Sequence, residues 1–222
     1  MSILAEALGV IPALFTGDSW EIAKALKTPG AWIIGFIVTV LGGLAVMWIY
    51  SVSPFIERHF ERSIMVYAYL FIAIIIFVEV IRRFVFSVQA PWSTTFPPVL
   101  FLVMTWFGCS YNIKLRTHLA FNEFRTKMSR KGQILCLSMD AVLWLGCCVI
   151  VVVTASRITA QSASNFQILG GTDNFLKWWF LITVPLAFIL MAGRVFENWR
   201  DDWRNYKSGE QIIRQAVIGG DA

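Results

Sequence analysis

The chain has 222 residues, of which 57% are hydrophobic and only 15% charged, and its mean hydropathy is +0.65. Because a soluble domain of this length has about a quarter of its residues charged, this composition excludes an ordinary soluble globular protein. The net charge of +5 does not indicate a nucleic-acid partner, because the basic residues gather in the short stretches between apolar segments.

Five apolar and almost uncharged segments follow one another along the chain: 31–52, 63–81, 96–113, 134–155 and 175–193. As a helix, about 20 such residues cross the ~30 Å hydrocarbon core of a bilayer. No segment alternates polar and apolar residues, and in lipid every backbone group needs an internal partner, so helices are favoured over strands. The sequence predicts an all-α polytopic membrane protein with four or five spans, and Pro185 predicts a kink in the last one.

Four parts of the chain differ in composition. Residues 1–30 form an amphipathic and polar N-terminal extension, and 31–53 form an additional transmembrane helix. Residues 54–197 hold a four-helix membrane domain, and 198–222 form an amphipathic tail. No internal repeat divides the chain further.

Lysine and arginine are distributed unevenly between the two ends of the predicted spans. If all five segments cross, thirteen of these residues fall on the side of the C-terminus and six on the other side. Because cytoplasmic loops carry the excess of basic residues, we expect a cytoplasmic C-terminus in a bacterial inner membrane. The N-terminus is then outside if 31–52 spans.

Three stretches on the cytoplasmic side combine an apolar stripe with a charged back: 54–62, 120–131 and the tail from residue 196. This pattern is typical of helices that lie on a membrane, and the alternative is an ordinary loop with snorkelling basic side chains. The side chains expected to anchor the protein at the membrane surface are Phe124, Met128, Trp178, Trp179, Phe196, Trp199 and Trp203.

Ionisable residues inside or near the spans are few. Glu79 precedes Arg82 and Arg83 by three and four residues, which favours a local ion pair, with contact to a partner subunit as the alternative. Asp140 lies about two turns into its segment, where it can pair with Arg130 or Lys131 or make a polar contact between helices. A proton relay would need a second buried titratable group, which the sequence does not offer.

No set of residues indicates catalysis, a cofactor or a metal. His59 and His118 lie in charged connecting segments, whereas haem ligation by two histidines needs both deep in facing spans. The four cysteines lack metal-ligand spacing, and no nucleophile–base motif is present. Glycines such as Gly35, Gly42 and Gly43 instead favour close helix packing, within the chain or against a partner.

From Glu57 to Glu197 an ordered set of short motifs resembles the small membrane (Q, or DctQ-type) subunit of tripartite ATP-independent periplasmic (TRAP) transporters. The residues that carry the resemblance are Glu57-Arg58, Arg82-Arg83 in Val-Ile-Arg-Arg-Phe-Val-Phe, Pro91-Trp92, Trp106-Phe107-Gly108, Arg116 with His118, Trp178-Trp179 and Pro185. The chain departs from the family pattern after Pro91-Trp92, where Ser93-Thr94-Thr95 replaces two acidic residues, and at Phe121-Asn122.

The resemblance implies a role without catalysis. Such a subunit pairs with a large membrane subunit (M) that holds the substrate and sodium sites, and a periplasmic binding protein delivers an organic acid, with C4-dicarboxylates as the family-level expectation. Candidate partner contacts are Glu57, Arg58, Glu79, Arg82, Arg83, Trp92, Trp106, Gly108, Arg116, His118 and Asp140. The rival hypotheses are the membrane anchor of a redox enzyme and an autonomous small transporter or channel.

Overall fold

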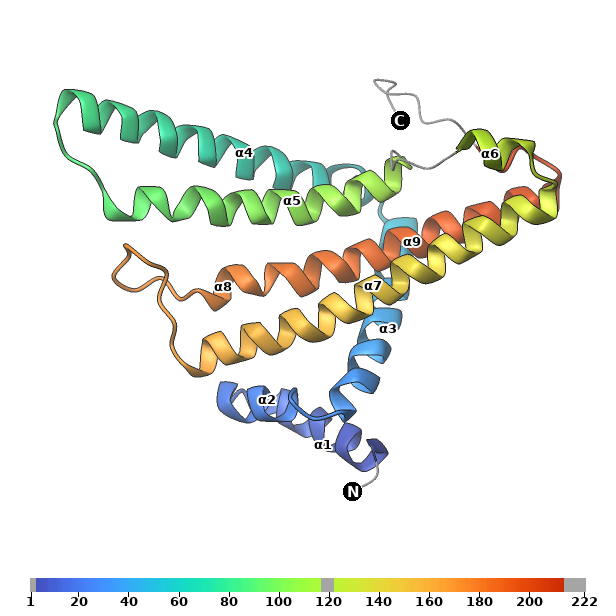
Figure 1. Cartoon of the computed structure of the whole chain (residues 1–222), viewed down its shortest axis with the longest axis horizontal. Coiled ribbons are helices and arrows are strands. Elements are labelled where there is room, and N and C mark those ends of the chain that lie inside the picture. Colours follow the sequence, from blue (N-terminus) through green and yellow to red (C-terminus); the bar gives the residue numbers. More distant parts are fainter. Residues whose placement is uncertain (1–2, 117–121, 214–222) are drawn as a thin grey trace.

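A computed structural model describes residues 3–116 and 122–213, which fold almost entirely into helices (Figure 1). Within these residues there is no strand, and a single β-bridge joins Ile168 to Leu176. The helices are α1 (Ile3–Phe15), α2 (Ser19–Ala25), α3 (Gly30–Val52), α4 (Pro54–Val85), the 3-10 helix η1 (Pro91–Thr94), α5 (Phe96–Leu115), α6 (Asn122–Lys127), α7 (Arg130–Ser164), α8 (Trp178–Leu181) and α9 (Thr183–Ser208).

Four long helices run side by side, and α3 crosses them steeply (Figure 1). The hairpin of α4 and α5 lies along one side of α9, and α7 lies along the other side. The core between α5, α7 and α9 is built from small and medium apolar side chains, among them Ile113, Cys148, Val152, Phe188 and Met191. The central position of α9 explains why it is the most buried of the long helices.

All five predicted spans are confirmed as helices long and apolar enough to cross a membrane. Two of them extend further than expected. The 54–62 stretch is not a separate surface helix, because it forms the first turns of α4, which runs without a break from Pro54 to Val85. The aromatic stripe from residue 196 likewise continues α9 to Ser208, where Gly209 at φ +82° ends the helix.

The kink predicted at Pro185 is present as a break between α8 and α9. Proline has no N–H to donate to the carbonyl four residues earlier, which here belongs to Leu181. The first helix ends at that residue and the second begins at Thr183.

The crossing of α3 over α9 depends on two glycines. A Cβ atom on Gly43 would lie 2.9 Å from the Phe196 ring and 3.1 Å from the Ala192 methyl group. A Cβ atom on Gly193 would lie 2.6 Å from a methyl group of Val46. These positions therefore allow the two backbones to approach closely, as predicted for Gly43.

The first two helices form a small unit beside α3 and α7. Val10 of α1 packs with Leu26, Ala31 and Ala160. The Arg157 side chain of α7 donates a hydrogen bond of 2.9 Å from Nε to the Leu26 carbonyl. The N-terminal extension is thus joined to the membrane helices rather than separate from them.

Candidate functional site: a buried ion-pair network

Arg194 of α9 and Glu61 of α4 form an ion pair inside the helix bundle. Both side chains are only 1% exposed, and Arg194 Nη2 lies 2.8 Å from Glu61 Oε2. Arg194 Nε also donates to that oxygen, at 3.1 Å. Burying two charges is costly, so such a pair persists only where further hydrogen bonds satisfy both groups.

The rest of the guanidinium group is fully bound. Arg194 Nη1 lies 2.8 Å from Glu197 Oε2 and 3.2 Å from Glu57 Oε1, and Nη2 donates to the Glu57 carbonyl at 2.8 Å. The Tyr50 ring covers one side of the guanidinium, with its centroid 4.0 Å from Cζ. All five N–H donors of the arginine therefore have acceptors, which a lysine could not achieve.

The second oxygen of Glu61 extends the network to two more helices. It accepts a hydrogen bond of 2.7 Å from the Ser110 hydroxyl of α5 and one of 3.4 Å from the Tyr50 hydroxyl of α3. Lys114 of α5 then pairs with Glu57 at 2.6 Å. We call Tyr50, Glu57, Glu61, Ser110, Lys114, Arg194 and Glu197 the Arg194 network. It joins α3, α4, α5 and α9.

A second layer of contacts lies closer to the ends of the helices. Arg116, which ends α5 with φ +54°, pairs with Asp202 at 2.6 Å and donates to the Asn198 carbonyl at 3.1 Å. Arg130 of α7 donates to the carbonyls of Asn205, Tyr206 and Gly209. A cation at the last turn of a helix satisfies carbonyl groups that have no partner within the helix.

The charged groups of the network bind one another, and none of them is left available as a reactive group. Every charged side chain in it is held by an opposite charge. Across residues 3–116 and 122–213 no three histidine, cysteine, aspartate or glutamate side chains are grouped so that they could hold a metal ion. The arrangement is that of a joint between helices.

Comparison with known families decides which class of membrane protein this is. The model of the DctQ component of tripartite ATP-independent periplasmic transporters matches residues 72–205, which is more than half of the chain. The chain belongs to the DctQ family. No curated protein matches the sequence.

The family membership confirms the resemblance read from the sequence motifs. The DctQ component is a non-catalytic part of a transporter that also contains a large membrane subunit and a periplasmic binding protein. With five helices long enough to span, the chain is a multi-pass protein of the inner membrane. The match begins inside α4, so α1, α2, α3 and the network residues Tyr50, Glu57 and Glu61 lie before it.

Several of the candidate partner contacts belong instead to ion pairs within the chain. Glu57 is part of the Arg194 network, and Arg116 binds Asp202. Asp140 pairs with Arg125 at 2.6 Å, so the expected pairing with Arg130 or Lys131 is wrong. The reason is that α6 brings Arg125 back beside α7, whereas Arg130 is engaged at the end of α9.

At the opposite end of the bundle Glu79 is fixed by two contacts. Its carboxylate lies 3.9 Å from Arg82 Nε and accepts a hydrogen bond of 2.9 Å from the Ala90 N–H. Among the described residues Arg83 makes no ion pair with Glu79, and it is exposed. The local pair thus forms with Arg82 and also holds the turn before η1.

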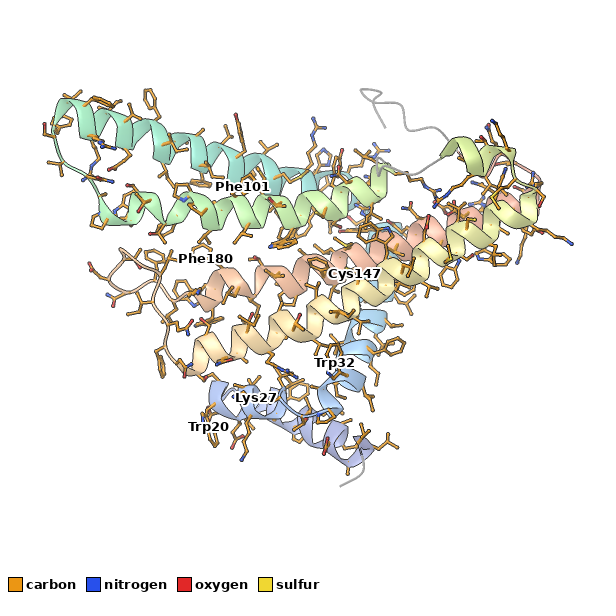
Figure 2. All side chains as sticks on the ribbon, in the orientation of Figure 1. Trp20, Lys27, Trp32, Phe101, Cys147 and Phe180 are labelled. Carbon is orange, nitrogen blue, oxygen red and sulfur yellow. The ribbon has the colours of Figure 1, made fainter. Side chains whose placement is uncertain are left out.

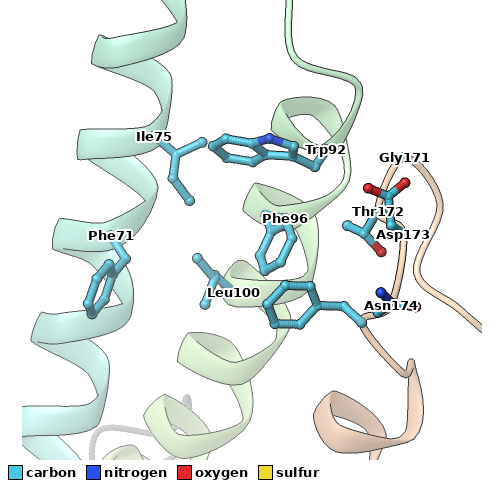
Figure 3. Close-up of a pocket in the computed structure, with 10 residues that line it drawn as sticks. Phe71, Ile75, Trp92, Phe96, Leu100, Gly171, Thr172, Asp173 and Asn174 are labelled. Atoms are coloured by element: carbon cyan, nitrogen blue, oxygen red, sulfur yellow. The ribbon is translucent and has the colours of Figure 1, made fainter.

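The aromatic residues of the family motifs lie in different surroundings. Trp92 borders a cavity of about 670 Å³ between α4, α5 and the loop at 171–175, with Phe96 and Leu100 beside it (Figure 3). Trp106 packs against Phe188 at 5.4 Å between ring centroids. Its buried indole N–H has no partner among the described residues.

The remaining candidates are distributed as follows. Gly108 faces Met65 across the α4–α5 hairpin, and Arg58 is exposed. His118 and the side chain of Phe124 lie outside the described residues. Met128 is exposed at the end of α6.

Among the expected membrane anchors, two face the chain itself. Phe196 contacts Gly43, and Trp199 packs on the core and donates to the Ser138 hydroxyl at 3.2 Å. Trp203 is exposed, as is Trp179, while Trp178 is half-buried. Anchoring at the membrane surface stays a prediction for these residues.

Sequence reasoning missed the centre of the network. From the sequence, Arg194 is one of the thirteen basic residues of the cytoplasmic side, and Glu61 lies on the charged back of the stretch 54–62. A usable signal was present, because Arg194 directly follows an apolar run without a charge from Phe180 to Gly193. An ionisable residue in such a run indicates an internal partner.

Proposed function

We propose that this chain supports the fixed part of the large membrane subunit of a sodium-coupled TRAP transporter for organic acids, with C4-dicarboxylates as the family-level substrate class. It also helps to dock the periplasmic binding protein. It moves no substrate itself, because its role is to hold its partner in position within the bilayer.

The proposal is carried by one observation: the charged groups of the Arg194 network are all bound to other groups of the same chain. A transport path needs ionisable groups that can exchange ligands or protons with a water-filled passage. Here the buried guanidinium uses all five donors on groups of the same chain, and Glu61 is bound by three side chains. Such a network favours helices that stay fixed relative to one another over helices that move during transport.

The distribution of charge supports a cytoplasmic C-terminus. The Arg194 network, the Arg116–Asp202 pair and the Arg130 contacts lie at the end of the bundle where α9 terminates. These arginines are among the thirteen basic residues that the sequence assigns to the cytoplasmic side. The opposite end, with Arg83, Trp92 and Trp179 exposed, would then face the periplasm and the binding protein.

The proposal is tested by affinity purification of the tagged chain from its native membranes in mild detergent. We expect a large multi-span protein to copurify in constant proportion with it. Purified chain without such a partner, at full recovery of folded protein, would contradict the proposed function.

A further inference from the structure

A groove of about 500 Å³ runs along the outer face of the α4–α5 hairpin. Met65 and Tyr69 of α4 form one wall, and Thr105, Gly108 and Cys109 of α5 form the other. The groove is open at Gly108, because no side chain fills it there and only the Met65 sulfur atom would lie within 4 Å of an added Cβ.

The groove lies at the depth of the hydrocarbon core. No charged residue occurs in α4 between Arg62 and Glu79, and Tyr69 lies near the middle of this stretch. In α5 none occurs between Phe96 and Ile113, and Thr105 and Gly108 lie near the middle. At about 1.5 Å per residue, Tyr69 lies about 10 Å along the helix from Arg62 and about 15 Å from Glu79, and Gly108 lies about 9 Å from Lys114.

Lipid alone is an unsuitable cover for this face. The Tyr69 side chain is 62% exposed, and its hydroxyl makes no hydrogen bond to any described residue. A hydroxyl group without a partner in hydrocarbon is unfavourable. By contrast, the exposed large side chains of α7 include Leu135, Met139, Leu143 and Ile150, which suit acyl chains. Side chains project from α7 along its length in Figure 2, where Cys147 of this helix is labelled.

We propose that this groove receives a transmembrane helix of the large membrane subunit. Only a helix can occupy that depth with its backbone groups satisfied. Gly108 allows the partner's backbone to approach closely, and Tyr69 donates a hydrogen bond to a carbonyl, hydroxyl or amide group of the partner helix. The inference rests on the proposed function and names the surface through which it acts.

Photo-crosslinking tests the position of the partner directly. The photoreactive residue p-benzoylphenylalanine is placed at position 69 in the full chain, coexpressed with the large subunit in native membranes. The matched control places it at position 143, where Leu143 is 64% exposed on α7. We expect an adduct with the large subunit from position 69 and none from position 143.

Two glycine variants provide the second test. Gly108→Leu fills the groove, and the fold survives because the nearest atom is the flexible end of Met65, 3.2 Å from the new Cβ. Gly146→Leu is the matched control, because nothing lies within 4 Å of a Cβ at that position on α7. Because the new side chain would occupy the space of the partner helix, we expect Gly108→Leu to lower the yield of the complex about tenfold, with the control unchanged.

The outcomes separate this inference from the proposed function. A complex that contains the large subunit but gives no adduct from position 69, or an adduct with a second copy of this chain, overturns the groove assignment alone. Equal yields for Gly108→Leu and Gly146→Leu do the same. Absence of any large partner in the purified material overturns the groove assignment and the proposed function together.

Discussion

Arg194 shows how a single side chain can determine the packing of four helices. Its guanidinium binds Glu57, Glu61 and Glu197 and lies against the Tyr50 ring. Because each contact comes from a fixed position on a helix, satisfying all of them together restricts how α3, α4 and α9 can pack. The Arg194 network thus helps to determine which helices pack together, whatever its net contribution to the free energy of unfolding.

Removing the arginine should therefore destabilise the protein strongly. In Arg194→Met the Glu61 carboxylate stays buried without an opposite charge, which costs about 3–5 kcal/mol. Thermal unfolding in detergent, followed by tryptophan fluorescence, measures the change. Arg204→Met, at an exposed position, is the control and should change stability by less than about 0.5 kcal/mol. Similar unfolding temperatures for the two variants would contradict the role of the network.

A lysine should not replace this arginine. Arg194→Lys keeps the charge but has three donors on one atom, so it cannot bind Glu57, Glu61 and Glu197 in the same plane. We expect it to unfold at a temperature closer to that of Arg194→Met than to that of the native protein. Native-like unfolding of Arg194→Lys would show that charge alone is sufficient.

At the scale of elements, the close crossing of α3 and α9 explains how an additional helix joins a family domain that begins after it. Gly43 and Gly193 bring the two backbones together, and Tyr50 then reaches the Arg194 network. The N-terminal helices are in turn connected to α7 through Arg157. The additional helix is thereby integrated into the bundle.

A bulky residue at this crossing should separate α3 from α9. Gly43→Leu would place a side chain where the Phe196 ring and the Ala192 methyl group already lie. We expect a loss of about 1–3 kcal/mol in stability, by the usual cost of overpacking. Gly146→Leu, with open space around its Cβ, serves as the control in the same unfolding assay. The interpretation of the crossing fails if the two leucine variants unfold alike.

The two tryptophans of the last helix should behave differently from one another. Trp199→Ser loses packing on the core and the hydrogen bond to Ser138, so it should lower the unfolding temperature. Trp203→Ser should leave the unfolding temperature nearly unchanged and instead weaken membrane binding or partner association, because Trp203 is exposed. Complex yield and unfolding temperature are measured for both. Equal losses of stability would contradict the different surroundings of the two rings.

The sequence was sufficient to predict the spans but not their extent. Uncharged runs of about 20 residues are a local signal, and they located α3, α4, α5, α7 and the α8–α9 pair. The first turns of α4 combine an apolar stripe with a charged back, a local pattern that predicts a surface helix. Arg194, the partner of Glu57 and Glu61, is 133 residues from Glu61, and no local pattern reports that α4 and α9 meet. The pairing of Arg125 with Asp140 depends instead on how α6 turns back beside α7, which the sequence pattern does not report.

For the whole molecule, the two ends of the bundle differ in what they present. At the end of α9, most basic side chains discussed above are occupied by contacts within the chain. At the opposite end Arg83 and Trp92 are exposed beside the turn that Glu79 holds. The opposite end is therefore the one available to a periplasmic partner in the proposed complex.

Charge reversal at that end should damage the complex. Arg82→Glu with Arg83→Glu removes the pair with Glu79 and places negative charge at the proposed docking surface. We expect a reduced yield of the complex or weaker capture of the binding protein in pull-down assays. Lys207→Glu, exposed at the other end, is the control and should have little effect. Equal and negligible effects of the two changes would contradict docking at this end.

The central claim is that this chain supports a transporter without transporting anything itself. Uptake of a labelled organic acid into liposomes under a sodium gradient, with the binding protein present, tests it most directly. We predict uptake when this chain and the large subunit are reconstituted together, and none above empty liposomes with this chain alone. Uptake by this chain alone, or full uptake by the large subunit without it, would contradict the account.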